Sequence, residues 1–212
     1  MDTVLFVFEI IGIIVFAISG AVVGMKKGMD MFGVCVMGFT TATTGGIVRD
    51  LILGITPPIV FREPIYAAVA VVSSIVVFIP FVQHEMIREK KIFDRIILIA
   101  DSAGLGVFSV VGVQCALENG AEWGLFLTVF VGTLTGVGGS VLRDIFAGNT
   151  PYIFVKHFYA CASMLGALLC ALLWNVIGNI AAMIIGASVI FLLRILAAVF
   201  HWHLPKYKGQ VM

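Results

Sequence analysis

TTGGIVRDLILGITPP, which runs from Thr43 to Pro58, places two adjacent glycines and an Arg-Asp pair in an otherwise apolar part of the chain. The pattern R-D-x-x-x-G-x-T-P begins at Arg49, as RDLILGITP, and begins again at Arg143, as RDIFAGNTP. Upstream of these motifs, GFTTATTGG (residues 38–46) aligns without gaps with GTLTGVGGS (residues 132–140). Because the matches are ordered and lie in corresponding segments, they indicate an internal duplication, which shapes every expectation about the fold.

The composition is that of an integral membrane protein. Hydrophobic residues make up 61% of the chain and charged residues only 12%, with a mean hydropathy of +1.13, whereas soluble domains are about half apolar and about a quarter charged. We therefore expect a single membrane domain over residues 1–212. A net charge of +1 gives no support to nucleic-acid binding. The cysteines lack metal-ligand spacing, so we expect no metal site and no cofactor.

Seven apolar segments are long enough to cross a bilayer, which takes about 20 helical residues. They cover residues 4–24, 33–54, 65–82, 95–116, 123–148, 157–175 and 178–200. With seven spans, the only basic residue that falls on one side of the membrane is Arg62. The other side receives Lys26, Lys27, Arg88, Lys90, Lys91, Arg95, Lys156, Lys206 and Lys208. Since positive residues stay in the cytoplasm, we expect an inner membrane protein with its N-terminus outside and its C-terminus cytoplasmic.

The two motif copies fall in the second and fifth predicted spans. An offset of three spans is odd, so the second copy is inverted in the membrane relative to the first. The pattern predicts an all-α protein with an inverted repeat of three plus three helices, about 4–82 and about 95–175, and an extra helix at about 178–200. Inverted repeats of this kind are typical of transporters and related proteins, with the pathway at the repeat interface.

Glycine pairs interrupt both motif-bearing spans, at Gly45-Gly46 and at Gly138-Gly139. Glycine pairs are known sites of helix kinks, and the backbone carbonyls that a kink releases can line a watery pathway and coordinate a cation. Thr44 and Ser140 flank the pairs, and their hydroxyls can cap released carbonyls or touch an ion. We expect broken helices that line an ion pathway. The alternative is close helix packing through small residues.

The Arg-Asp pairs, Arg49-Asp50 and Arg143-Asp144, lie near the ends of their spans. Adjacent residues on a helix do not face each other, so we expect each side chain to seek a partner on another helix. The pairs are either structural clamps between helices or charges at the mouths of a pore. The sequence leaves both interpretations open.

Further polar residues lie within other predicted spans. Asp101 can attract a cation, whereas Arg194 can pair with an acidic residue or extend toward the cytoplasmic side. Ser19 and Ser102 hold roughly equivalent positions and can line one cavity. Glu9 lies close to the start of its span, so we expect it to extend to the membrane surface. The chain has no catalytic motif, and we expect no enzymatic activity.

Three further phrases complete a family pattern: FAISGAVVGMKKGMDMFG (Phe16 to Gly33), ADSAGLGVFSVVG (Ala100 to Gly112) and FYACASMLGALL (Phe158 to Leu169). With the doubled G-G-x-x-R-D motif, they resemble the prokaryotic members of the trimeric intracellular cation (TRIC) channel family, which shares its domain family with proteins called glycine transporters. The resemblance covers nearly the whole chain. It implies a homotrimer of seven-helix subunits, each with its own pore between glycine-broken helices, that carries monovalent cations, chiefly potassium.

The chain departs from the family pattern in its glycines. The family often has three in a row, whereas here Thr44 precedes one pair and Ser140 follows the other. The leading hypothesis is a channel for potassium, with sodium as a possible second ion, embedded among membrane lipids. The alternatives are a secondary transporter of a small amino acid such as glycine, and a membrane scaffold in which the glycines serve only packing.

Overall fold

The computed structural model describes residues 3–79, 90–119, 124–155 and 158–202, and these residues form helices and connectors without a β-strand. Two helices, α3 (Ile59–Arg62) and α8 (Tyr152–Val155), are single turns, and α4 (Pro64–Phe78) is a shorter apolar helix. Six helices are long and apolar enough to cross a membrane: α1 (Thr3–Lys26), α2 (Met31–Ile52), α6 (Lys90–Asn119), α7 (Gly124–Phe146), α9 (Tyr159–Ile177) and α10 (Asn179–Val199).

Local sequence explains where the helices begin. Asp30 caps α2, because its side chain accepts a hydrogen bond of 2.8 Å from the Gly33 amide. Pro64 occupies the first turn of α4, where its missing N–H costs nothing. Gly178 alone separates α9 from α10 and adopts a φ of 88°, a conformation that favours glycine.

The predicted spans coincide with helices to within a few residues, except for the third. The predicted span at 65–82 coincides only in part with α4, which ends at Phe78, and residues 80–82 lie outside the described residues. The 15 residues of α4 rise about 22 Å at about 1.5 Å per residue, less than the roughly 30 Å of a hydrocarbon core. The structure thus gives an all-α membrane protein with six clear spans and one shorter apolar helix.

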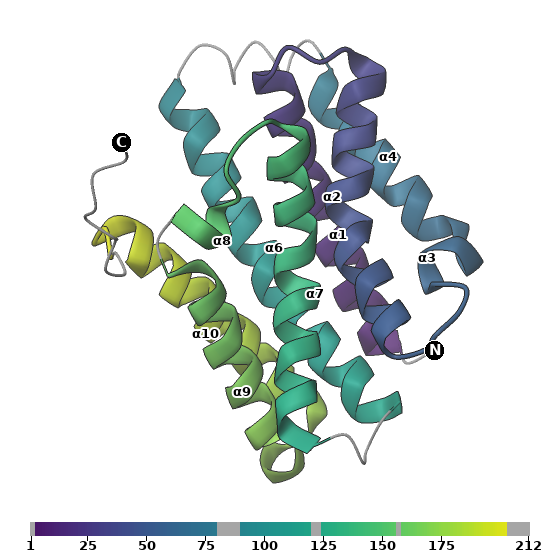
Figure 1. Cartoon of the computed structure of the whole chain (residues 1–212), viewed down its shortest axis with the longest axis vertical. Coiled ribbons are helices and arrows are strands. Elements are labelled where there is room, and N and C mark those ends of the chain that lie inside the picture. The colour runs from purple at the N-terminus through teal and green to yellow at the C-terminus, as the bar shows by residue number, and fades with distance from the viewer. Residues whose placement is uncertain (1–2, 80–89, 120–123, 156–157, 203–212) are drawn as a thin grey trace, which may run out of the picture.

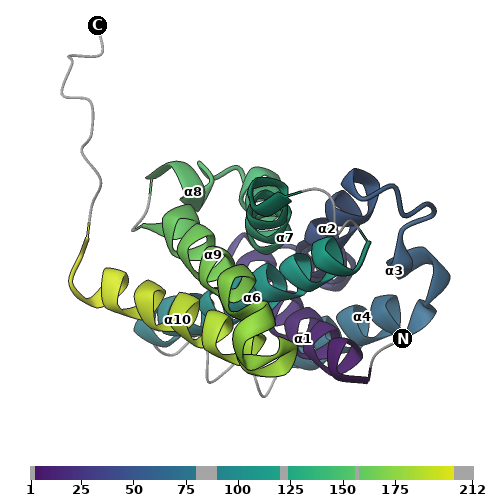
Figure 2. The ribbon, with the colours of Figure 1, turned by 90° about the horizontal axis from the view of Figure 1, so that it is seen from below.

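The helices pack as two groups of three with one helix added. In the first group α1, α2 and α4 contact one another, and in the second group α6, α7 and α9 do so. Contacts between α2 and α7, and between α1 and α6, join the groups, while α10 packs on α6 and α9 (Figure 1). Seen from below, α3 and α4 lie at one side of the molecule and α8 to α10 at the other (Figure 2).

Large apolar side chains cover much of the outer surface of this bundle. Phe126 is 84% exposed and Val176 is 75% exposed. Several charged side chains lie inside instead, and among them Arg143 and Asp101 are at most 1% exposed. This inversion of the soluble pattern fits a protein surrounded by lipid.

The expected glycine interruptions are absent: α2 and α7 each run through their glycine pair as one continuous helix. The glycines lie instead where the two helices cross. A Cβ at Gly45 would collide with the Thr135 carbonyl oxygen, and a Cβ at Gly139 would collide with the Thr41 carbonyl oxygen. Small residues allow such close backbone contact between membrane helices. The packing alternative therefore holds for Gly45 and Gly139.

The other two glycines of the pairs differ from each other. Gly138 lies against the first pair, since a Cβ there would come within 3.2 Å of the Gly45 Cα. Gly46 has open space beside it, with the nearest atom, Nη2 of Arg49, 4.0 Å from a Cβ position. Gly46 borders a cavity, which is described below.

Candidate functional site

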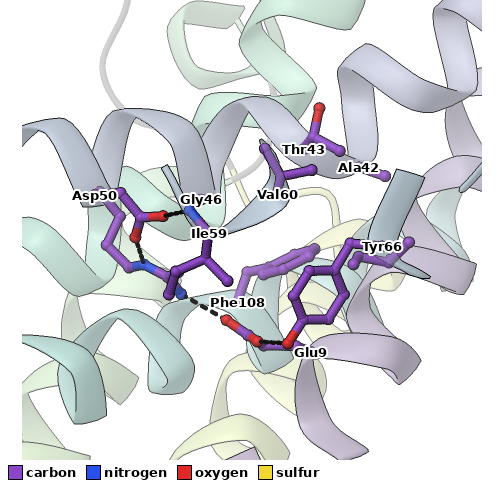
Figure 3. Close-up of a pocket in the computed structure, with 11 residues that line it drawn as sticks. Glu9, Ala42, Thr43, Gly46, Asp50, Ile59, Val60, Tyr66 and Phe108 are labelled. Atoms are coloured by element: carbon purple, nitrogen blue, oxygen red, sulfur yellow. Dashed lines mark hydrogen bonds and ion pairs between the residues drawn. The ribbon is translucent and has the colours of Figure 1, made fainter. Parts of the chain in front are cut away.

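Arg49 is the centre of a buried cluster that joins three helices, here called the Arg49 cluster (Glu9, Arg49, Asp50 and Tyr66). Nε of Arg49 donates to Oδ1 of Asp50 at 2.8 Å, and Nη1 donates to Oε1 of Glu9 on α1 at 3.0 Å. The Tyr66 hydroxyl on α4 donates to the other Glu9 oxygen at 2.5 Å. Figure 3 shows this chain of contacts running from Asp50 to Tyr66. Both Glu9 oxygens are therefore hydrogen-bonded to protein groups, which compensates for the burial of a residue that is only 4% exposed.

Asp50 also fixes the connector that follows α2. Its Oδ2 accepts a hydrogen bond of 2.8 Å from the Ile59 amide at the start of α3. The first amides of a helix lack partners within that helix, and a carboxylate is a good acceptor for them. One side chain thus neutralises Arg49 and holds the turn that leads to α4.

A small cavity lies beside the Arg49 cluster and is lined by residues of α1, α2, α3, α4 and α6. Its volume is about 30 Å³, which is enough for at least one water. Glu9, Arg49 and Asp50 line it together with Thr43, Gly46 and the ring of Phe108 (Figure 3). The cavity has room for water or a small ion next to Glu9, Arg49 and Asp50.

Arg143 is the centre of a second buried cluster, here called the Arg143 cluster (Ser19, Asp101, Arg143 and Asp144). Nη1 of Arg143 donates to Oδ1 of Asp101 on α6 at 2.6 Å and to the Ser19 hydroxyl on α1 at 2.7 Å. Nε and Nη2 donate to Oδ1 of Asp144 at 3.0 and 2.9 Å. The guanidinium is therefore held by two carboxylates and one hydroxyl.

The surroundings of Arg143 repeat those of Arg49. Oδ2 of Asp144 accepts from the Tyr152 amide at the start of α8 at 2.9 Å, as Asp50 does for α3. The Tyr159 hydroxyl on α9 donates to Ser140 at 2.9 Å. Tyr66 and Tyr159 thus follow their motif copies at similar distances, and each ties the third helix of its group to the arginine region.

Arg194 of α10 adds a second cation to the Arg143 cluster alone. Its Nη2 lies 3.9 Å from Oδ2 of Asp101, and its guanidinium carbon lies 4.4 Å from the centre of the Tyr159 ring. The Arg49 cluster combines one arginine with two carboxylates, whereas the Arg143 cluster with Arg194 combines two arginines with two carboxylates. With every group in its ordinary state, the first is net negative and the second neutral.

The structure brings most of the predicted charged residues together as clamps between helices. Arg49 and Arg143 find acids on another helix, as expected, but each also bonds the adjacent aspartate, which was not expected. Their long side chains fold back along the helix end far enough to reach it. Arg194 pairs with Asp101, one of its two predicted alternatives.

The predicted hydroxyls have three different surroundings. Thr44 donates to the Thr40 carbonyl at 2.6 Å and Ser140 to the Val137 carbonyl at 2.9 Å, so both bond within their own helices. Ser19 contacts Arg143, while the buried Ser102 hydroxyl has no hydrogen-bond partner among the described residues. Ser19 and Ser102 are therefore not joined by a hydrogen bond in the described part of the chain.

Glu9 is the residue that the sequence interpretation placed wrongly. It was expected to extend to the membrane surface, yet it is buried and bonded to Arg49 and Tyr66. The sequence could have indicated this contact, because an arginine buried in a membrane protein requires an acidic partner, and Glu9 is an acid within a predicted span. The tyrosine that follows each motif copy was visible in the sequence, but its role was not.

The comparisons with known proteins cover nearly the whole chain. A family model described as "Glycine transporter" matches residues 6–81 and 98–175. The inner membrane protein YadS of Escherichia coli is 34% identical over 202 residues, which are 94% of this chain and 94% of YadS.

Solved structures match equally well. A chain described under "Structural basis for conductance through TRIC cation channels" is 35% identical, with a TM-score of 0.83 and full coverage of both chains. The TRIC trimeric intracellular cation channel orthologue from Rhodobacter sphaeroides is 31% identical, with a TM-score of 0.86, over 95% of this chain and 100% of that chain.

Proposed function

This chain belongs to the glycine transporter family, and we propose that it is a TRIC-type cation channel rather than an enzyme or a scaffold. The observation that carries the proposal is the net negative Arg49 cluster beside a small cavity. Negative charge that is buried in protein lowers the energy of a cation that passes near it. The relatives with solved structures are described as cation channels, which agrees with this chemistry.

We extend the proposal to the organisation of the channel. Seven spans form an inverted three-plus-three repeat with an extra helix, the N-terminus lies outside and the C-terminus in the cytoplasm, and three identical subunits assemble in the cell membrane. Each subunit has its own pathway for potassium, and sodium is the second candidate ion. The two groups of three packed helices support the repeat, and the basic side of the chain supports the orientation.

Within a subunit, we place the pathway along the crossing of α2 and α7. Gly46 and Thr43 of α2 line the cavity, and the neighbouring Gly45 packs against α7 at Thr135 and Gly138. The close contact of the two helices at Gly45 and Gly139 narrows the route between them. The described conformation is therefore a closed one, and a shift of one helix against the other would widen the route.

A secondary transporter of glycine remains the second candidate, since the family model carries that description. The solved structures weigh against it, because they are described as structures of cation channels.

Conductance of the purified protein in planar bilayers tests the proposal, with a potassium gradient against sodium so that the reversal potential reports selectivity. We expect unitary cation currents and a lower unitary conductance for Glu9→Gln, which removes the surplus negative charge and keeps the shape of the side chain. Saturable glycine counterflow without unitary currents would overturn the channel in favour of the transporter.

A further inference from the structure

Arg194 joins the Arg143 cluster from α10, the helix outside both groups of three. It is 2% exposed, and its Nη2 lies 3.9 Å from Oδ2 of Asp101. That distance allows strong attraction between opposite charges but exceeds the range of a direct hydrogen bond. The guanidinium also lies over the Tyr159 ring at 4.4 Å, which holds it against α9 by a cation–π contact.

Glu9 and Asp101, the acids that contact Arg49 and Arg143 from another helix, differ in how many of their carboxylate oxygens accept hydrogen bonds. Glu9 has both oxygens hydrogen-bonded, one to Arg49 and one to Tyr66. Asp101 has Oδ1 bonded to Arg143, whereas its buried Oδ2 accepts no hydrogen bond from the described residues. That second oxygen is a good ligand for a cation, and Nη2 of Arg194 lies 3.9 Å from it.

An ion at Oδ2 of Asp101 would have to displace or approach the Arg194 guanidinium. Two like charges at a few ångströms repel each other strongly where water is excluded. The Arg49 cluster has no second arginine among the described contacts, and Glu9, Arg49 and Asp50 line the adjacent cavity. The difference between the clusters is therefore one fixed positive charge.

We propose that Arg194 acts as a fixed positive charge that neutralises Asp101 and excludes a mobile monovalent cation from Oδ2 of Asp101. Each subunit therefore holds its ion beside Glu9. The inference rests on the proposed cation pathway and assigns Arg194 as a residue that determines where the ion is held. It predicts that neutralising Arg194 creates a second cation site, with Oδ2 of Asp101 as a ligand.

Potassium-dependent thermal stabilisation of the purified protein in detergent tests this, with choline chloride replacing potassium chloride at constant ionic strength. A ligand that binds the folded state raises its unfolding temperature. For Arg194→Gln we expect at least about a tenfold lower potassium concentration at half-maximal stabilisation than for the wild type, which corresponds to about 1.4 kcal/mol. The control Arg194→Lys keeps the positive charge and is expected to match the wild type.

The double variant Asp101→Asn with Arg194→Gln separates charge from packing. It removes both partners and restores a neutral cluster, so the gain in potassium affinity should disappear. The inference is overturned if Arg194→Gln gains no affinity, or if the double variant keeps the gain. A purely structural Arg194 would change the unfolding temperature equally in potassium and in choline.

A second pair of variants keeps the test valid if Arg194→Gln fails to fold. Because the wild-type Asp101 holds no mobile ion in this scheme, Asp101→Asn should retain potassium binding, whereas Glu9→Gln should lose it. Loss of binding in Asp101→Asn to the same extent as in Glu9→Gln overturns the inference. These measurements need no current, so a wild type without unitary conductance would contradict the channel proposal separately.

Discussion

The Arg49 and Arg143 clusters start from the same two residues and reach different net charges. In both, an arginine bonds its neighbouring aspartate and an acid from the first helix of its group, and the aspartate caps a single-turn helix. Only the Arg143 cluster receives Arg194 from α10. The repeated motif therefore determines the contacts that the two clusters share, whereas residues outside the motif determine the net charge of each cluster.

The largest effect should separate the two arginines. Arg49→Met leaves Glu9 and Asp50 buried without their cation, whereas Arg143→Met leaves Asp101 with Arg194 still beside it. Breaking a buried ion pair costs about 3–5 kcal/mol. We expect a loss of that order for Arg49→Met and a smaller loss for Arg143→Met, measured as the unfolding temperature in detergent. Equal losses would show that Arg194 does not compensate.

The two tyrosines give the next contrast. Tyr66 donates to a carboxylate, and Tyr159 donates to the neutral hydroxyl of Ser140. Hydrogen bonds to charged groups contribute about 1.5–3 kcal/mol and neutral ones about 0.5–1.5 kcal/mol. Tyr66→Phe should therefore destabilise the protein more than Tyr159→Phe in the same unfolding measurement. The reverse order would mean that the Tyr159 hydroxyl has a stronger role than its bond to Ser140.

The glycines give the smallest of these contrasts. A methyl group at Gly139 meets the Thr41 carbonyl at the crossing of α2 and α7, whereas the same group at Gly46 has open space. Overpacking costs about 1–3 kcal/mol, so Gly139→Ala should lower the unfolding temperature while the control Gly46→Ala leaves it unchanged or raises it. Because Gly46 borders the cavity, Gly46→Ala should reduce unitary conductance instead. An equal loss of stability in both variants would contradict the assigned crossing.

The sequence predicted the spans well because long apolar segments in a membrane protein have few alternatives to helix. The doubled motif likewise pointed to Arg49, Asp50, Arg143 and Asp144. Glu9 was placed wrongly, because its burial depends on a contact with Arg49 of another helix, which the sequence around Glu9 does not indicate. The expected helix breaks at the glycines were wrong because a packed neighbour stabilises a continuous helix through Gly45 and Gly139.

The order in which the acids and arginines appear along the chain bears on how the protein enters the membrane. Glu9 precedes Arg49 by 40 positions, and Asp101 precedes Arg143 by 42 positions. In each case the helix that carries the acid emerges from the ribosome before the helix that carries the cation. A lone charged side chain deep in hydrocarbon costs at least about 2.5–3.5 kcal/mol. The favourable unit of insertion is therefore a helical hairpin, α1 with α2 and α6 with α7, in which the charges neutralise each other.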